Sequence, residues 1–97
     1  MKNIELQIFD ITKNEPLEQI EEDALLSLKY EKKSGYITIE GNSEGLISLA
    51  KILLGFAYND IPEMFELHLD AKREGCFGML DDDSNDIVIM KKWNNCV

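Results

Sequence analysis

The stretch from Tyr36 to Asp70 constrains the fold more than any other part of the chain. It reads YITIEGNSEGLISLAKILLGFAYNDIPEMFELHLD: a β-rich run, a glycine turn, a long apolar helix pattern, a loop with proline and a second alternating run. Elements in this order commonly form a sheet with a helix packed across one face. The stretch therefore predicts an α+β fold.

The helix signal begins after Gly41, where either Asn42 or Ser43 can act as the N-cap. We expect Gly41 to serve the strand-to-helix turn and Gly45 to allow close approach of the first helical turn to its neighbour. Apolar residues then recur at helical spacing in two stripes, and one sheet covers only one of them. The stripe expected to face the sheet is Leu46, Leu49, Ala50, Leu53, Phe56 and Ala57, and the second is Ile47, Leu54 and Tyr58.

Strand signals lie on both sides of the helix. Alternation at residues 4–9 predicts a first strand, and the runs 24–31 and 36–40 predict an antiparallel hairpin whose loop uses Gly35 at positive φ. Residues 65–70 and 86–92 predict the last two strands. The result is an antiparallel sheet of about five strands, in sequence order β-β-β-α-β-β, with one main helix on one face. The expected inward-facing residues of the hairpin are Ile37 and Ile39, opposite Leu26, Leu28 and Tyr30.

Length and charge restrict the class of partner. Ninety-seven residues predict a single domain spanning 1–97. Ten basic against 19 acidic residues give a formal net charge of -9, which repels nucleic acid and anionic membrane surfaces and favours capture of a cationic protein. The N-terminal residues lack the apolar run of a signal peptide or membrane span, so we expect a cytoplasmic protein.

Glu66, His68 and Asp70 alternate along a predicted strand and therefore project from one face. A metal site is disfavoured, because His68 is the sole histidine and adjacent positions on one strand do not converge on an ion. The trio is either a solvated sheet face or a surface that meets basic residues of a partner.

Asp81, Asp82 and Asp83 form an acidic run in the long connection between the last two strands. A calcium loop starting at Asp81 would need glycine at its sixth position and glutamate at its twelfth, where the chain has Asp86 and Lys92. A mobile acidic loop is expected instead, which can still bind a basic partner. The serines show no pairing with a histidine, so we predict no enzyme activity and no cofactor.

Three segments resemble a known family: GNSEGLISLAKIL at 41–53, LHLD at 67–70 and IVIM at 87–90. They are similar to the immunity proteins of bacterial polymorphic toxin systems, specifically immunity protein family thirty-two, from Tyr36 onward. The resemblance implies a cytoplasmic, non-catalytic protein that binds and neutralises a toxin domain encoded beside it. Members often carry a second histidine two residues before the position of His68, where this chain has Glu66.

The first hypothesis is therefore an inhibitor that covers a basic toxin surface, a nuclease being a natural target because nucleases are cationic where they hold phosphates. An alternative is a self-associating structural or regulatory domain that forms a homodimer through the second helical stripe or an open sheet face. A small hydrolase using His68 and Asp70 is the third hypothesis. The residues expected to bind the partner are Glu66, His68, Asp70, Asp81, Asp82 and Asp83.

Overall fold

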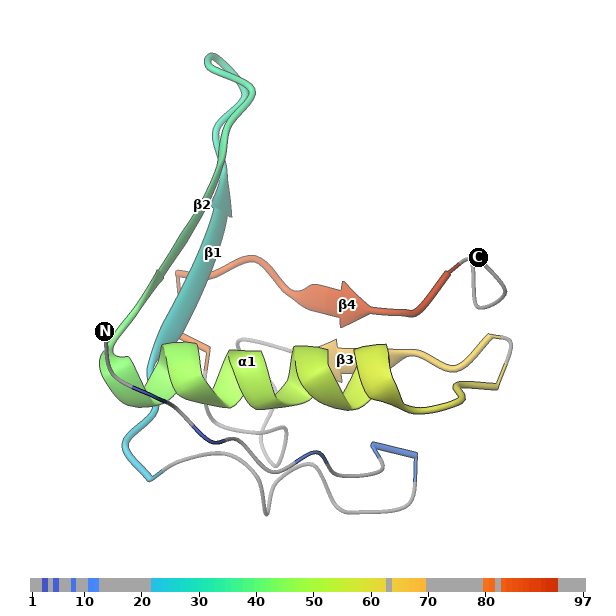
Figure 1. Ribbon diagram of the computed structural model, residues 1–97. Coiled ribbons are helices and arrows are strands. Elements are labelled where there is room, and N and C mark those ends of the chain that lie inside the picture. Colours follow the sequence, from blue (N-terminus) through green and yellow to red (C-terminus); the bar gives the residue numbers. More distant parts are fainter. Residues whose placement is uncertain are drawn as a thin grey trace.

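The computed structural model describes residues 3, 5, 8, 11–12, 22–62, 64–69, 80–81 and 83–92. Within these residues the chain forms one helix and four strands, arranged as Figure 1 shows. The prediction of an α+β fold is confirmed. In sequence order the elements are β1 (Leu26–Tyr30), β2 (Ile37–Gly41), α1 (Ser43–Tyr58), β3 (Leu67–Leu69) and β4 (Ile87–Ile89).

The first pair of strands is the predicted antiparallel hairpin. Leu28 lies opposite Ile39, and Tyr30 lies opposite Ile37. Gly35 in the connecting turn has φ 78°, the left-handed conformation that glycine adopts at little cost, as expected. The expected burial is confirmed for Leu26, but it is wrong for Ile37 and Ile39, because every residue of β2 is exposed. Figure 1 shows the reason: the hairpin projects from the N-terminal end of α1, so its outer half has no layer against it.

The prediction of one sheet with about five strands is also wrong. The described residues hold four strands in two separate antiparallel pairs, β1 with β2 and β3 with β4. The other edge of β1 contacts residues 80–81 and 84–85 rather than another named strand. Leu80 bridges Leu26 in parallel, and Asp81 N–H donates to the Leu26 carbonyl at 2.8 Å. Most of the predicted strand 4–9 lies outside the described residues.

The helix has the predicted position, but it buries only part of the predicted face. The buried residues are Gly45, Ser48, Ile52, Gly55 and Phe56; of the predicted stripe, Phe56 is buried, whereas Leu46 and Leu53 are exposed. On this buried face, Gly45 lies close to Leu25, the residue that precedes β1. A Cβ atom added to Gly45 would overlap the carbonyl oxygen of Leu25, so the expected close approach at this glycine is confirmed.

Asn42 joins the start of the helix to the start of β1. Its Oδ1 accepts hydrogen bonds from Gly45 N–H at 2.7 Å and from Leu25 N–H at 3.0 Å. Its Nδ2 donates to the Asp23 carbonyl at 2.8 Å, and its own N–H donates to the Leu25 carbonyl. Of the two predicted candidates, Asn42 is therefore the N-cap, and it also anchors the neighbouring strand.

The core lies between α1 and the two sheets. Phe56 of the helix packs against Phe65, with ring centroids 6.0 Å apart. At the C-terminal end of α1, Lys91 Nζ donates to the carbonyl oxygens of Ala57 and Asn59, which complements the negative end of the helix dipole. The buried apolar residues are Ile11, Ala24, Leu26, Ile52, Phe56, Ile61, Leu67, Leu69 and Leu80.

Candidate functional site

Glu66 and His68 lie on the outer face of the β3–β4 sheet. Leu67 and Leu69 point into the core while His68 points outward, which is the alternation that the sequence predicted. His68 Nε2 and Glu66 Oε2 are 2.9 Å apart, and their side chains are 50% and 39% exposed. A side-chain contact this open to water contributes about 0–1 kcal/mol to stability. Asp70, the third member of the predicted trio, lies outside the described residues.

Described residues of and beside the aspartate run lie along the edge of β1. Besides the Asp81 contact described above, Asn85 N–H donates to the Leu28 carbonyl at 2.8 Å. Ser84 Oγ accepts a hydrogen bond from Leu28 N–H, also at 2.8 Å. Asp81 and Asp83 themselves are exposed, while Asp82 lies outside the described residues. Most of the connection expected to be a mobile loop also lies outside the described residues, so its mobility stays a prediction.

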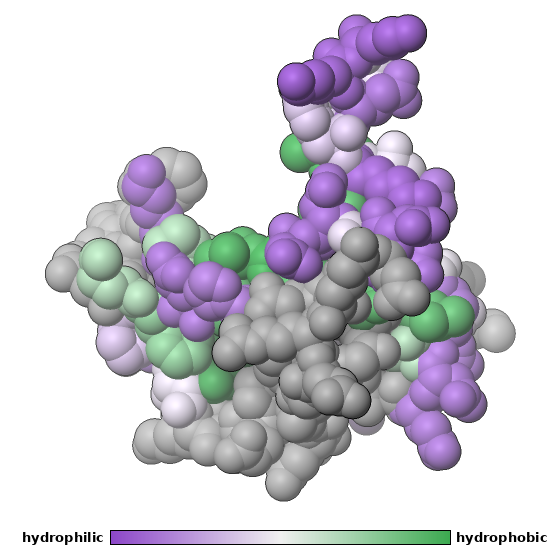
Figure 2. Space-filling view, turned by 180° about the vertical axis from the view of Figure 1, so that it is seen from behind, coloured by the Kyte–Doolittle hydropathy of each residue, from purple (hydrophilic) through white to green (hydrophobic). Residues whose placement is uncertain are grey.

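The structure places the predicted partner-binding residues on two different sheets. Glu66 and His68 belong to the β3–β4 pair, whereas Asp81 lies beside β1. Asp81 is instead brought next to two residues that the sequence reasoning did not select, Ser27 and Glu40. Figure 2 shows hydrophilic residues gathered over the projecting hairpin and continuing below it.

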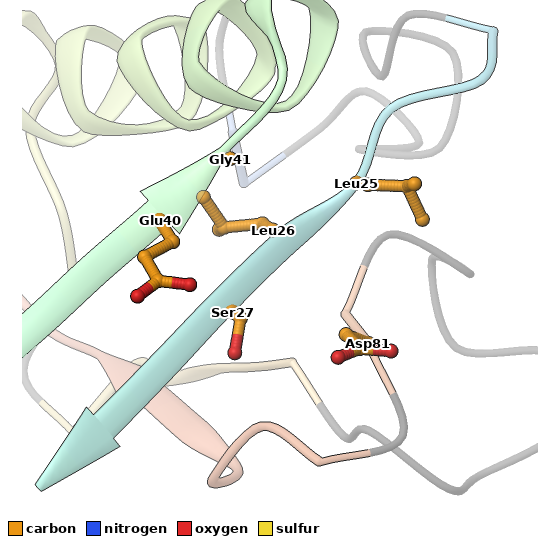
Figure 3. A pocket seen from close by; sticks show the side chains of 6 residues that line it. All are labelled: Leu25, Leu26, Ser27, Glu40, Gly41 and Asp81. Atoms are coloured by element: carbon orange, nitrogen blue, oxygen red, sulfur yellow. The ribbon is translucent and has the colours of Figure 1, made fainter.

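A recess of about 420 Å³ opens beside β1, and we name it the Ser27 recess. Ser27 and Glu40 are direct partners in the β1–β2 register, so their side chains share one face of the hairpin. Asp81 flanks β1 on its other edge, and Figure 3 shows Ser27 between the two carboxylates. The recess is lined by Leu25, Leu26, Ser27, Glu40, Gly41 and Asp81.

Ser27 is the chemically unusual member of this recess. The residue is only 8% exposed, and its buried Oγ has no hydrogen-bond partner in the part of the chain that the structure describes. An unsatisfied buried hydroxyl costs about 1–3 kcal/mol, so such groups are uncommon in native structures. The sequence signal for it was a single serine inside the apolar run LLSLKY, whereas Glu40 carried no signal beyond its place at the end of a strand.

The described ranges also bear on two other classes of site, metal centres and membrane spans. Among these residues, no group of three or more histidine, cysteine, aspartate or glutamate side chains is arranged to hold a metal ion. The helix that they form, α1, lacks the length and apolar content needed to cross a bilayer.

Comparison with known proteins gives one family. Neither the curated proteins nor the solved structures include a significant match to this chain. The family model described as immunity protein 32 matches residues 36–92, from the turn of the β1–β2 hairpin to the end of the described chain. Since the match spans more than half of the sequence and agrees with the resemblance noted above, the protein belongs to the immunity protein 32 family.

Proposed function

We propose that this protein binds and neutralises a bacterial toxin domain encoded beside it, without catalysis, by covering a basic surface of that toxin. Membership of the immunity protein 32 family is the observation that carries the proposal. We further propose that the binding surface includes Glu66, His68, Asp70 and the run Asp81 to Asp83. A nuclease is the natural target, because its phosphate-binding surface is cationic.

Charge and exposure support this mode of inhibition. The chain has a net charge of -9, and Asp81, Asp83 and Glu66 are all exposed. The carboxylates of Asp81 and Asp83 are carried by a segment whose backbone is bonded to β1, so little order is lost when a partner binds. Complementary fields of this kind raise association rates to roughly 10⁸–10⁹ M⁻¹ s⁻¹ at low salt.

Co-expression tests the function directly. The protein is expressed together with the C-terminal domain of the large secreted protein encoded next to it, and growth and co-purification are both measured. We expect restored growth and a stable complex. A neighbouring gene without toxin activity, or a toxic domain that still kills in the presence of this protein, would contradict the proposal.

The salt dependence of association tests the acidic surface. Because the Debye length shrinks from about 10 Å at 0.1 M salt to about 3 Å at 1 M, we expect the association rate with the toxin domain to fall steeply with salt. The double variant Asp81→Lys and Asp83→Lys should slow association at low salt, by at least about tenfold. Glu31→Lys in the hairpin turn is the matched control. A rate that does not vary with salt would refute electrostatic capture.

The alternative function is a self-associating domain, and one surface favours it. Tyr30, Ile37 and Ile39 share one face of the hairpin and are 56%, 63% and 52% exposed. Apolar side chains gathered on an open sheet face are typical of protein contacts. If they form a homodimer, light scattering should give twice the monomer mass at high concentration, and Ile37→Lys should restore the monomer. A monomer at every concentration would remove this alternative.

A further inference from the structure

The Ser27 recess combines features that point to a bound cation. Two carboxylates, those of Glu40 and Asp81, flank a buried hydroxyl that lacks a partner among the described residues. This hydroxyl has lost its water without gaining a protein partner there. A positively charged hydrogen-bond donor would relieve that cost and be attracted by both carboxylates.

We propose that the Ser27 recess receives the side-chain ammonium of a lysine from the toxin, and this assignment rests on the proposed function. The ammonium has three N–H donors, and the recess offers it three acceptor groups. Glu40 and Asp81 supply charge-assisted hydrogen bonds from opposite sides, and Ser27 Oγ accepts the third at the floor. The lysine stem would lie against the exposed side chain of Leu25.

The backbone geometry suits a guest of this size. Glu40 and Asp81 flank β1 on its two edges, so their backbones are two strand spacings apart, about 10 Å. Figure 3 shows the side chains of Glu40 and Asp81 on either side of Ser27. A calcium ion would require six to eight oxygen ligands, more than two carboxylates and one hydroxyl provide.

The Ser27 recess is preorganised, because the backbones of Glu40 and Asp81 are already fixed in the free protein. Glu40 is held by its ladder position opposite Ser27, and Asp81 is held by its N–H bond to the Leu26 carbonyl. Neither backbone therefore has to be ordered when the lysine enters, which removes one of the usual costs of binding.

A titration with a small probe tests the recess without any toxin. Nitrogen-15 labelled protein is titrated with n-butylammonium chloride at constant ionic strength, with butan-1-ol as the neutral control and n-propylguanidinium as the arginine analogue. We expect saturable amide shifts at Leu26, Ser27, Gly41 and Asp81 with n-butylammonium, no such saturation with butan-1-ol, and weaker binding of the guanidinium. Equal or tighter guanidinium binding would overturn the assignment to lysine.

Charge-neutral variants test the two carboxylates. Glu40→Gln and Asp81→Asn should each weaken n-butylammonium binding by roughly 10- to 100-fold, the range expected for loss of a hydrogen bond to a charged group. Glu31→Gln removes the same charge from the exposed hairpin turn and should leave binding unchanged. Equal affinity in all three variants, or shifts spread uniformly over the protein, would overturn the proposal.

Ser27→Ala separates a binding role from a structural one. Because the Ser27 hydroxyl has no partner among the described residues of the free protein, its removal should leave the urea midpoint unchanged or raise it while weakening n-butylammonium binding several-fold. A lower midpoint with unchanged binding would overturn the role of Ser27. Failure of the probe titration with intact toxin neutralisation would reject the recess alone, whereas probe binding without neutralisation would reject the proposed function.

Discussion

Replacement of Gly45 by alanine is expected to destabilise the protein by about 3 kcal/mol, the upper part of the range for overpacking a tight contact. The new Cβ atom would overlap the carbonyl oxygen of Leu25 and lie 2.7 Å from its carbonyl carbon. Both atoms belong to the backbone, so no side-chain rotation relieves the overlap. Alanine improves helix propensity by about 1 kcal/mol, which offsets only part of this cost.

Urea and thermal unfolding measure the effect of Gly45→Ala. For a domain of about 100 residues, 3 kcal/mol lowers the melting temperature by more than about 10 °C. Gly35→Ala is the control, because Gly35 has φ 78° but nothing within 4 Å of an added Cβ. It should cost only about 1–2 kcal/mol, the price of the left-handed conformation. A Gly45→Ala protein as stable as the parent would show that α1 does not pack closely against Leu25.

Replacement of Asn42 by alanine is expected to have the second largest effect, a loss of about 2–3 kcal/mol. The amide side chain makes three hydrogen bonds, to Gly45 N–H, Leu25 N–H and the Asp23 carbonyl. Loss of an N-cap alone typically costs about 1 kcal/mol, and each of the other two bonds contributes about 0.5–1.5 kcal/mol. The substitution thus removes the side-chain bonds between the helix start and the segment before β1, while the backbone bond from residue 42 to the Leu25 carbonyl remains.

Two companion variants assign this loss to the amide of Asn42. Asn42→Asp keeps the acceptor oxygen and removes the donor to Asp23, so we expect a smaller loss of about 1 kcal/mol. Ser43→Ala changes the neighbouring residue that the sequence offered as the other cap, and it should shift the unfolding free energy by less than about 0.5 kcal/mol. If Ser43→Ala were the more damaging variant, the cap assignment would be wrong.

Local signals predicted the individual elements well. The helix begins where the glycine turn and the cap residues placed it, and the hairpin turns at Gly35 with the expected pairing of Leu28 and Ile39. These features depend on residues a few positions apart, which hydrogen-bond or pack with one another in any fold that contains them.

The buried face of the helix was predicted only in part, for a physical reason. Hydropathy favours large apolar side chains, so it selected Leu46 and Leu53, which are exposed. The face that packs contains Gly45, Ser48 and Gly55, whose value lies in their small size. Close backbone approach depends on the shape of the partner element, and a single helix pattern carries no information about that shape.

The sequence by itself determined the α+β class, the two cap candidates, the turn glycine and the acidic character, because each follows from neighbouring residues or from composition. Only the tertiary structure decided that residues 80–81 and 84–85 join the edge of β1, and so places Asp81 beside Ser27 and Glu40. Backbone hydrogen bonds between distant segments form through groups that every residue carries, so they leave no mark on side-chain patterns. For that reason, no sequence motif predicted the candidate recess.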